Sequence, residues 1–124
     1  VLKEKYPGIK RIVVEPESAA VMSGGEPNAH KIQGIGEGFI PDNMDMSVQD
    51  DIEKVGDDDA IRMAQRLATS EGVLCGISGG ANVVAAMEVS KKLKPGNKVV
   101  TVIPDNVFRY FSTDLFPLPG EKTR

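Results

Sequence analysis

Two short polar segments could carry chemistry, and each follows an apolar run. The first is Gly76–Ala81, which reads G-I-S-G-G-A, and the second is Pro104-Asp105-Asn106. A hydroxyl placed between a strand and a helix start, with glycines that let a ligand approach the backbone, can hydrogen-bond a planar ring atom or an anionic group. In open α/β sheets, ligands bind outside the carboxyl ends of strands. Both segments are therefore candidate ligand sites.

Ser78, the hydroxyl of the first segment, has two further interpretations. Serine is among the commonest helix N-cap residues, so Ser78 could bond only the amides of a first helical turn. Its segment also matches G-x-S-x-G, the nucleophile elbow of α/β-hydrolases. In that fold the histidine follows the serine, whereas the single histidine here, His30, precedes it. The hydrolase interpretation fails within this chain, and capping and ligand binding both stay open.

A third candidate is a loop with glycines at alternate positions, Gly34, Gly36 and Gly38. Alternate glycines remove side chains from one side of an extended chain, so such a loop can lie against a small ligand or move over it. The structural alternative is a surface loop that needs positive φ angles. The loop does not match the P-loop pattern, so nucleotide binding has no support. We expect His30, just before it, to be a structural hydrogen-bonding residue rather than a base.

The first half of the chain predicts two short strands, a long loop and a helix. Val1–Lys5 is typical of a helix end, and we expect a strand at Arg11–Val14 and a short edge strand at Ile52–Val55. The stretch from Glu15 to about Asp45 is rich in glycine, proline and serine and predicts irregular structure. Three aspartates precede Ala60–Ala68, whose apolar residues share one helical face.

The second half predicts the alternation of strand and helix that an α/β sheet needs. Gly72–Gly76 is a short apolar run, Ser78–Gly80 a turn, and the next helix runs from about Ala81 to Leu93. Val99–Ile103 is β-branched and predicts a buried strand. This order predicts an α/β fold with a mainly parallel sheet flanked by helices.

Composition narrows the class of partner. The 124 residues are 40% hydrophobic and carry a formal net charge of -3, which suits one globular domain and gives no basic footprint for nucleic acid or anionic membranes. No apolar run could span a bilayer, and we expect a cytoplasmic protein. One cysteine and one histidine make a metal site improbable. The opening, a helix end without methionine, suggests a missing N-terminal portion.

Four segments resemble, in the same order, the C-terminal part of the cysteine synthase (O-acetylserine sulfhydrylase) family. They are Glu15-Pro16, His30–Pro41, Gly76–Ala81 and Pro104–Phe116. The K-I-Q-G-I-G form in the second segment is more like cysteine synthase than cystathionine β-synthase. The resemblance implies that residues 1–124 are the C-terminal portion of the large domain of a fold type II enzyme that uses pyridoxal 5'-phosphate (PLP).

The resemblance also implies roles for five residues. Ser78 is similar to the serine that hydrogen-bonds the pyridine nitrogen of PLP, and Pro104 and Asp105 match the strand exit beside the pyridine edge. Gly34 and Gly36 match the loop that faces the substrate side of the cofactor. The family replaces the acetate of O-acetylserine with sulfide to form cysteine, through chemistry that PLP supplies. A homodimer is implied for the full-length protein, with serine acetyltransferase as a candidate partner.

Other parts of the family pattern find no match in the chain. The Schiff-base lysine and the phosphate loop belong to family segments before the matched part, so we assign no catalytic residue and expect the chain alone to be inactive. Gly79 stands where a second serine is common, and Asn106-Val107-Phe108 replaces S-G-E. A cystathionine β-synthase-like enzyme and a non-catalytic truncated paralogue, acting as a binding module, are the alternatives.

Overall fold

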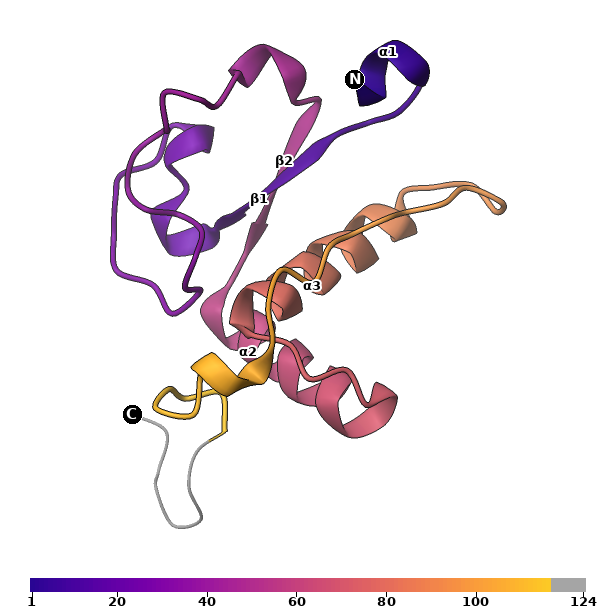
Figure 1. Ribbon diagram of the computed structural model, residues 1–124. Coiled ribbons are helices and arrows are strands. Elements are labelled where there is room, and N and C mark those ends of the chain that lie inside the picture. Colours follow the sequence, from indigo (N-terminus) through magenta and orange to yellow (C-terminus); the bar gives the residue numbers. More distant parts are fainter. Residues whose placement is uncertain (117–124) are drawn as a thin grey trace.

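The computed structural model describes residues 1–116, which form a two-stranded sheet beside a pair of packed helices (Figure 1). The helices are α1 (Leu2–Lys5), α2 (Asp57–Arg66) and α3 (Ile77–Lys91), and the strands are β1 (Ile12–Pro16) and β2 (Asp51–Val55). Short 3-10 helices cover Glu17–Ala19, Val21–Ser23, Met46–Val48 and Val107–Arg109, and a π-helical turn extends α2 over Leu67–Glu71. No helix in this part of the chain is long and apolar enough to cross a membrane.

The two strands pair in parallel, with Ile12 opposite Asp51 and Pro16 opposite Val55. This confirms both predicted strands and the parallel pairing. The connection between them is largely irregular, as expected from its glycines and prolines. Its first turns are anchored by Glu15, whose buried carboxylate accepts hydrogen bonds from the Met22 backbone N–H and the Ser23 hydroxyl. The end of β1 therefore fixes the start of the loop.

Helices α2 and α3 approach each other through small residues. Ala60 and Ala64 on α2 are buried, as are Ala81 and Ala85 on α3. A Cβ placed on Gly80 would lie 2.1 Å from the carbonyl oxygen of Ala60, so only glycine permits this contact. The predicted helix at 60–68 is confirmed, and its apolar face meets α3.

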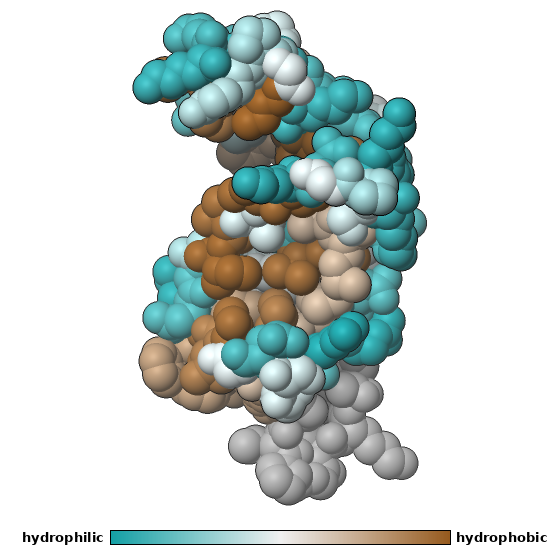
Figure 2. Space-filling model, turned by 90° about the vertical axis from the view of Figure 1, so that its right-hand side faces the viewer, coloured by the Kyte–Doolittle hydropathy of each residue, from teal (hydrophilic) through white to brown (hydrophobic). Residues whose placement is uncertain are grey.

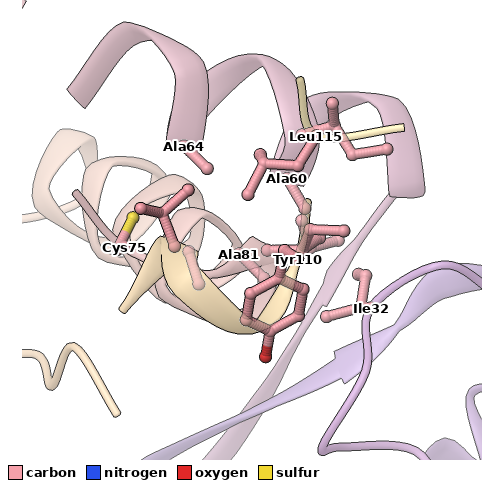
Figure 3. Packing of buried hydrophobic residues seen from close by; sticks show 12 residues of the cluster. Ile32, Ala60, Ala64, Cys75, Ala81, Tyr110 and Leu115 are labelled. Atoms are coloured by element: carbon pink, nitrogen blue, oxygen red, sulfur yellow. The ribbon is translucent and has the colours of Figure 1, made fainter. Parts of the chain in front are cut away.

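One buried cluster joins segments that are far apart in the sequence. Ile32 comes from the glycine loop, Ile77 from the start of α3, and Tyr110 and Leu115 from the last described segment. Figure 3 shows Ile32 and Tyr110 on the same side of the cluster as the first turns of α3. The core therefore holds the loop and the two polar segments in one neighbourhood.

The structure corrects two predictions in the second half. Helix α3 begins at Ile77 rather than at about Ala81, because the Gly80 N–H donates to the Gly76 carbonyl at 3.2 Å and the predicted turn at Ser78–Gly80 is thereby helical. Val99–Ile103 is extended but exposed, and within residues 1–116 it pairs with no other strand. The β-branched run has the composition of a buried strand, yet a strand forms only where a neighbour completes the hydrogen-bond ladder. Of Gly72–Gly76, only Cys75 makes an isolated bridge, to Asn106.

Candidate functional site

Ser78 lies inside α3 and does not cap it. The N-cap position is Gly76, with φ -75° and ψ 176°, and no side chain caps this helix start. Ser78 is the second helical residue, and its side chain is only 4% exposed. The helix-cap interpretation of Ser78 is therefore wrong, while the ligand interpretation stays a prediction.

A carboxyl–phenol pair lies next to this helix start. The Tyr110 hydroxyl donates a 2.5 Å hydrogen bond to Oδ2 of Asp105. The other oxygen, Oδ1, is buried and has no hydrogen-bond partner among the described residues. A Cβ on Gly76 would lie 2.4 Å from that Oδ1 and 2.4 Å from Cε2 of Tyr110. Glycine at position 76 is thus what allows Asp105 and Tyr110 to sit against the first turn of α3.

The surroundings of Tyr110 keep its phenol protonated. Burial, followed by the hydrogen bond and the negative charge of Asp105, raises the pKa of Tyr110 to about 12. The Arg109 charge and the neighbouring Ser78 hydroxyl act on this pKa in the opposite sense. A protonated phenol is a hydrogen-bond donor, so Tyr110 remains bonded to Asp105 at neutral pH. Sequence reasoning gave Tyr110 no role, although it lies in the segment 104–116 that carries the family resemblance.

The two predicted strand exits come together, as the fold class requires. The Val107 N–H donates to the Leu74 carbonyl at 3.2 Å, and Asn106 bridges Cys75. Pro104 is exposed on the approach to Asp105. The Asn106 side chain turns away to accept from the Phe108 N–H at 3.1 Å, which starts the 3-10 helix at Val107–Arg109. Ser78 and Asp105 both lie next to Tyr110, and Pro104 directly precedes Asp105 in the chain.

The glycine loop is shaped by His30. Its Nδ1 accepts from the Ile32 N–H at 3.2 Å, so the proton of the neutral ring lies on Nε2, which donates to the Gly36 carbonyl at 2.9 Å. The imidazole thus spans the loop from its start to Gly36. This confirms the expectation that His30 is a structural hydrogen-bonding residue.

Gly34 and Gly36 meet the demands of the loop in different ways. Both have positive φ, +90° at Gly34 and +67° at Gly36. A Cβ on Gly34 would meet nothing within 4 Å, whereas one on Gly36 would lie 2.5 Å from Cγ of Pro16. Gly36 therefore rests on the carboxyl end of β1, and Gly34 is exposed. Within the described part of the chain, no hydrogen bond links either glycine to Ser78 or Asp105.

A family model described as pyridoxal-phosphate dependent enzyme matches residues 1–105. The chain belongs to this family. Residues 1–116 contain no group of three or more His, Cys, Asp or Glu side chains that could hold a metal ion. The family assignment confirms the resemblance on which Ser78, Pro104 and Asp105 were selected, while their individual roles stay predictions.

Relatives of the chain include cysteine synthases and an O-acetylserine dependent cystathionine beta-synthase. The chain is 50% identical over 116 residues to the cysteine synthase of Staphylococcus aureus, covering 94% of this chain and 37% of that protein. It is 47% identical over 115 residues to the O-acetylserine dependent cystathionine beta-synthase of Bacillus subtilis, covering 93% of this chain and 37% of that protein. The chain thus spans little more than a third of these curated relatives.

Solved structures give the same result for the fold. O-acetylserine sulfhydrylase isoform 3 of Entamoeba histolytica superposes with a TM-score of 0.91 at 39% identity, covering 98% of this chain and 37% of that chain. The predicted α/β class with a parallel sheet is confirmed by this match. The two-stranded sheet seen here therefore belongs to a fold that is considerably larger in its relatives.

The residues at the start of α3 fit the pyridine edge of PLP. Ser78 offers a hydroxyl, and the unpaired Oδ1 of Asp105 marks a buried polar position beside it. A hydroxyl can donate to an uncharged ring nitrogen, which is the only polar atom on that edge of the ring. The phosphate and aldehyde ends of PLP have no matching group among the motifs of this chain, so the fit concerns one edge of the cofactor.

Proposed function

We propose that this chain is part of a PLP-dependent enzyme that makes cysteine from O-acetylserine and sulfide. The observation that carries the proposal is the chain's 50% identity to a cysteine synthase. The position of Ser78, which is buried at the start of α3, fits the cofactor role that this similarity implies. The match continues through the glycine loop and the segment that bears Asp105.

Ser78 is the residue proposed to hold the cofactor ring. Its hydroxyl would donate to the pyridine nitrogen, which leaves that nitrogen uncharged. PLP, when bound, supplies an electron sink for removing the acetate from the β-carbon of the amino acid. Asp105, held by the hydrogen bond from the Tyr110 hydroxyl, would line the ring edge with Pro104 beside it.

The glycine loop is proposed to receive the amino-acid substrate. Gly34 carries no side chain into the space around it, and Gly36 keeps the backbone against Pro16. The bonds from His30 to Ile32 and Gly36 limit the conformations that the loop can adopt before substrate arrives. A loop ordered in advance loses less conformational entropy on binding.

The proposal includes the protein's partners and location. We expect the full-length protein to be a homodimer in the cytoplasm, with serine acetyltransferase as a candidate binding partner. The catalytic lysine and phosphate loop would lie in a part of the protein outside the 124 residues.

A cystathionine β-synthase-like activity is the second candidate. It is favoured by the 47% identity to the O-acetylserine dependent cystathionine beta-synthase of Bacillus subtilis. The same cofactor edge would serve both activities, because the two differ in the nucleophile that replaces acetate. Assaying the full-length protein with sulfide and, separately, with homocysteine decides between them.

Ser78→Ala in the full-length protein tests the cofactor role. Loss of one neutral hydrogen bond costs about 1 kcal/mol, so PLP should bind about fivefold more weakly and cysteine should form more slowly. Ser90→Ala is the matched control, because Ser90 lies on the same helix, is exposed, and its hydroxyl donates to the Met87 carbonyl. Equal PLP affinity and equal rates in both variants would contradict the assignment of Ser78.

A further inference from the structure

Three polar side chains meet at the start of α3. The Tyr110 hydroxyl donates to Oδ2 of Asp105 at 2.5 Å, and the Ser78 hydroxyl lies next to the same phenol. Ser78 and Tyr110 are each only 4% exposed. Tyr110 therefore lies next to a carboxylate and also next to the hydroxyl that we propose as a cofactor contact.

A hydroxyl and a carboxylate act on a pyridine nitrogen in opposite ways. An opposite charge within about 4–6 Å favours the charged form of a titratable group, so a carboxylate favours a protonated ring nitrogen. A serine hydroxyl can donate its proton to the lone pair of an uncharged nitrogen, which favours the neutral form. The contact that the ring nitrogen makes, with Ser78 or with Asp105, would therefore decide its charge. That charge sets how strongly the cofactor ring withdraws electrons.

The chain itself surrounds both oxygens of the Asp105 carboxylate. Oδ2 accepts the hydrogen bond from Tyr110. Oδ1 is buried, has no hydrogen-bond partner within residues 1–116, and lies so close to the backbone of Gly76 that a Cβ there would clash with it. The described structure thus gives Asp105 a bond to the phenol and none to Ser78.

The phenol of Tyr110 has a single proton, and Asp105 accepts it. Burial, together with the bond to Asp105, raises the pKa of Tyr110 to about 12, so this proton stays in the bond at neutral pH. The phenol oxygen can then only accept from Ser78. The Ser78 hydroxyl can turn its proton from the phenol oxygen to a ring nitrogen, because Tyr110 keeps its bond to Asp105 in either case.

We propose that Tyr110 is a positioning residue that keeps the pyridine nitrogen of the cofactor uncharged, because it holds the Asp105 carboxylate in a hydrogen bond of its own. The inference rests on the proposed function, since it takes the Ser78 hydroxyl as the contact of that nitrogen. Without the phenol hydroxyl, the carboxylate loses its donor, and a ring N–H would become the donor available to it. The ring nitrogen would then take a proton from solvent and carry a positive charge.

NMR measures the charge of the ring nitrogen directly. The full-length protein is loaded with PLP that carries ¹⁵N in its ring. In the unchanged protein, the resonance should be that of an uncharged nitrogen across the neutral pH range. In Tyr110→Phe it should move to the position of a protonated nitrogen. We expect the proton affinity of the nitrogen to rise at least about tenfold, because a charge-assisted hydrogen bond to Asp105 replaces the lost phenol bond.

Two further variants separate this role from a merely structural one. Combining Tyr110→Phe with Asp105→Asn removes the carboxylate charge, so the nitrogen should be uncharged again. Val89→Ala is the control for lost stability, because Val89 is half-buried on the same helix and lines the apolar groove that Figure 2 shows, which includes none of the three polar side chains. This variant should unfold more easily and still keep an uncharged nitrogen.

A tyrosine analogue tests the same inference if Tyr110→Phe does not fold. A ring-fluorinated tyrosine at position 110 keeps nearly the same shape, but its phenol loses the proton at a lower pH. The phenolate cannot donate to Asp105, so the ring nitrogen should gain a proton over the pH range in which the phenol loses its own. Two titrations that do not coincide would contradict the inference.

Three other outcomes would overturn the inference about Tyr110. One is an uncharged nitrogen in folded, PLP-loaded Tyr110→Phe, and another is a nitrogen that stays protonated in the double variant. The third is a protonated nitrogen in the unchanged protein, a measurement that needs no variant to fold. Each of these leaves the proposed function standing if the unchanged protein makes cysteine. A full-length protein that binds no PLP would overturn the proposed function and, with it, this inference.

Discussion

The Tyr110 hydroxyl donates to one oxygen of Asp105 at 2.5 Å, while the other oxygen is buried and has no hydrogen-bond partner within residues 1–116. Tyr110 is only 4% exposed, and the pair fits against the helix because Gly76 has no side chain. The pair lies against the first turn of α3, which carries Ser78. It therefore links the segment after Ile103 to the element that we propose as the cofactor site.

Tyr110→Phe should leave both oxygens of Asp105, of which Oδ1 is buried, without a hydrogen-bond partner among the described residues. Removing one partner of a buried hydrogen bond costs about 1–3 kcal/mol, and we expect the free energy of unfolding to fall by that amount. Urea unfolding measures the loss. Tyr6→Phe is the control, because Tyr6 is 61% exposed and should be nearly neutral. Equal stability of the two variants would contradict the Tyr110–Asp105 bond.

The same residue predicts a change of stability in alkali. The pKa of Tyr110 is raised to about 12 in the folded chain, from about 10 in an unfolded one. A raised pKa stabilises the fold fully below the unfolded value, and this contribution is lost as the pH rises from about 10 toward 12. Ultraviolet titration of the phenols should show a late step that Tyr110→Phe removes. If the late titration step persists in Tyr110→Phe, it belongs to a group other than Tyr110.

His30 should control the order of the glycine loop through two separable bonds. Asparagine can place its amide oxygen near the position of Nδ1, and glutamine can place its amide NH₂ near that of Nε2. His30→Gln therefore loses the acceptor for the Ile32 N–H, and exchange of this amide should become about fivefold faster, which corresponds to one hydrogen bond of about 1 kcal/mol. His30→Asn keeps that acceptor, so the Ile32 amide should stay protected. Hydrogen exchange followed by NMR resolves this amide. The same rate in both variants would show that the ring does not hold Ile32.

Gly34 and Gly36 form a matched pair for testing the loop. Alanine at either position adopts a left-handed conformation at a cost of about 1–2 kcal/mol. Gly36→Ala also forces a Cβ to within 2.5 Å of Pro16, so it should cost about 1–3 kcal/mol more than Gly34→Ala. Unfolding free energies of the two variants test this difference. If Gly36→Ala lowers the free energy of unfolding no more than Gly34→Ala does, the loop does not pack against β1.

Asp50 should make the start of the sheet sensitive to acid. It accepts from Lys3 Nζ at 2.7 Å and from the Arg11 N–H at 2.8 Å, and these bonds hold the pKa of its carboxyl well below the usual range. A lowered pKa stabilises the fold above the unfolded value of about 3.9, and this is lost as the pH falls below it. Asp50→Asn should lower the urea midpoint of unfolding at pH 7. In acid, the midpoints of the variant and of the unchanged chain should become equal. Asp42→Asn, at an exposed position, is the control and should not change it.

The sequence by itself determined the positions of most elements. The β-branched run at Arg11–Val14 and the apolar face of Ala60–Ala68 correspond to β1 and α2 because local periodicity reports which face of an element is buried. The ordered motifs from Glu15 to Phe116 gave the family, which the match over residues 1–105 shows. They also selected Ser78 and Asp105, both of which lie next to Tyr110 in the structure, while their roles stay predictions.

Tertiary structure decided what no local pattern carries. Gly80 of helix α3 approaches Ala60 across the helix pair, a contact with a residue twenty positions away that no local pattern indicates. Tyr110 acquires a partner only when Asp105 is held against Gly76. Val99–Ile103 has the composition of a strand, but a β-ladder requires a second backbone, and no strand of residues 1–116 pairs with it. Propensity is a property of the segment, whereas pairing and close packing depend on its neighbours in space.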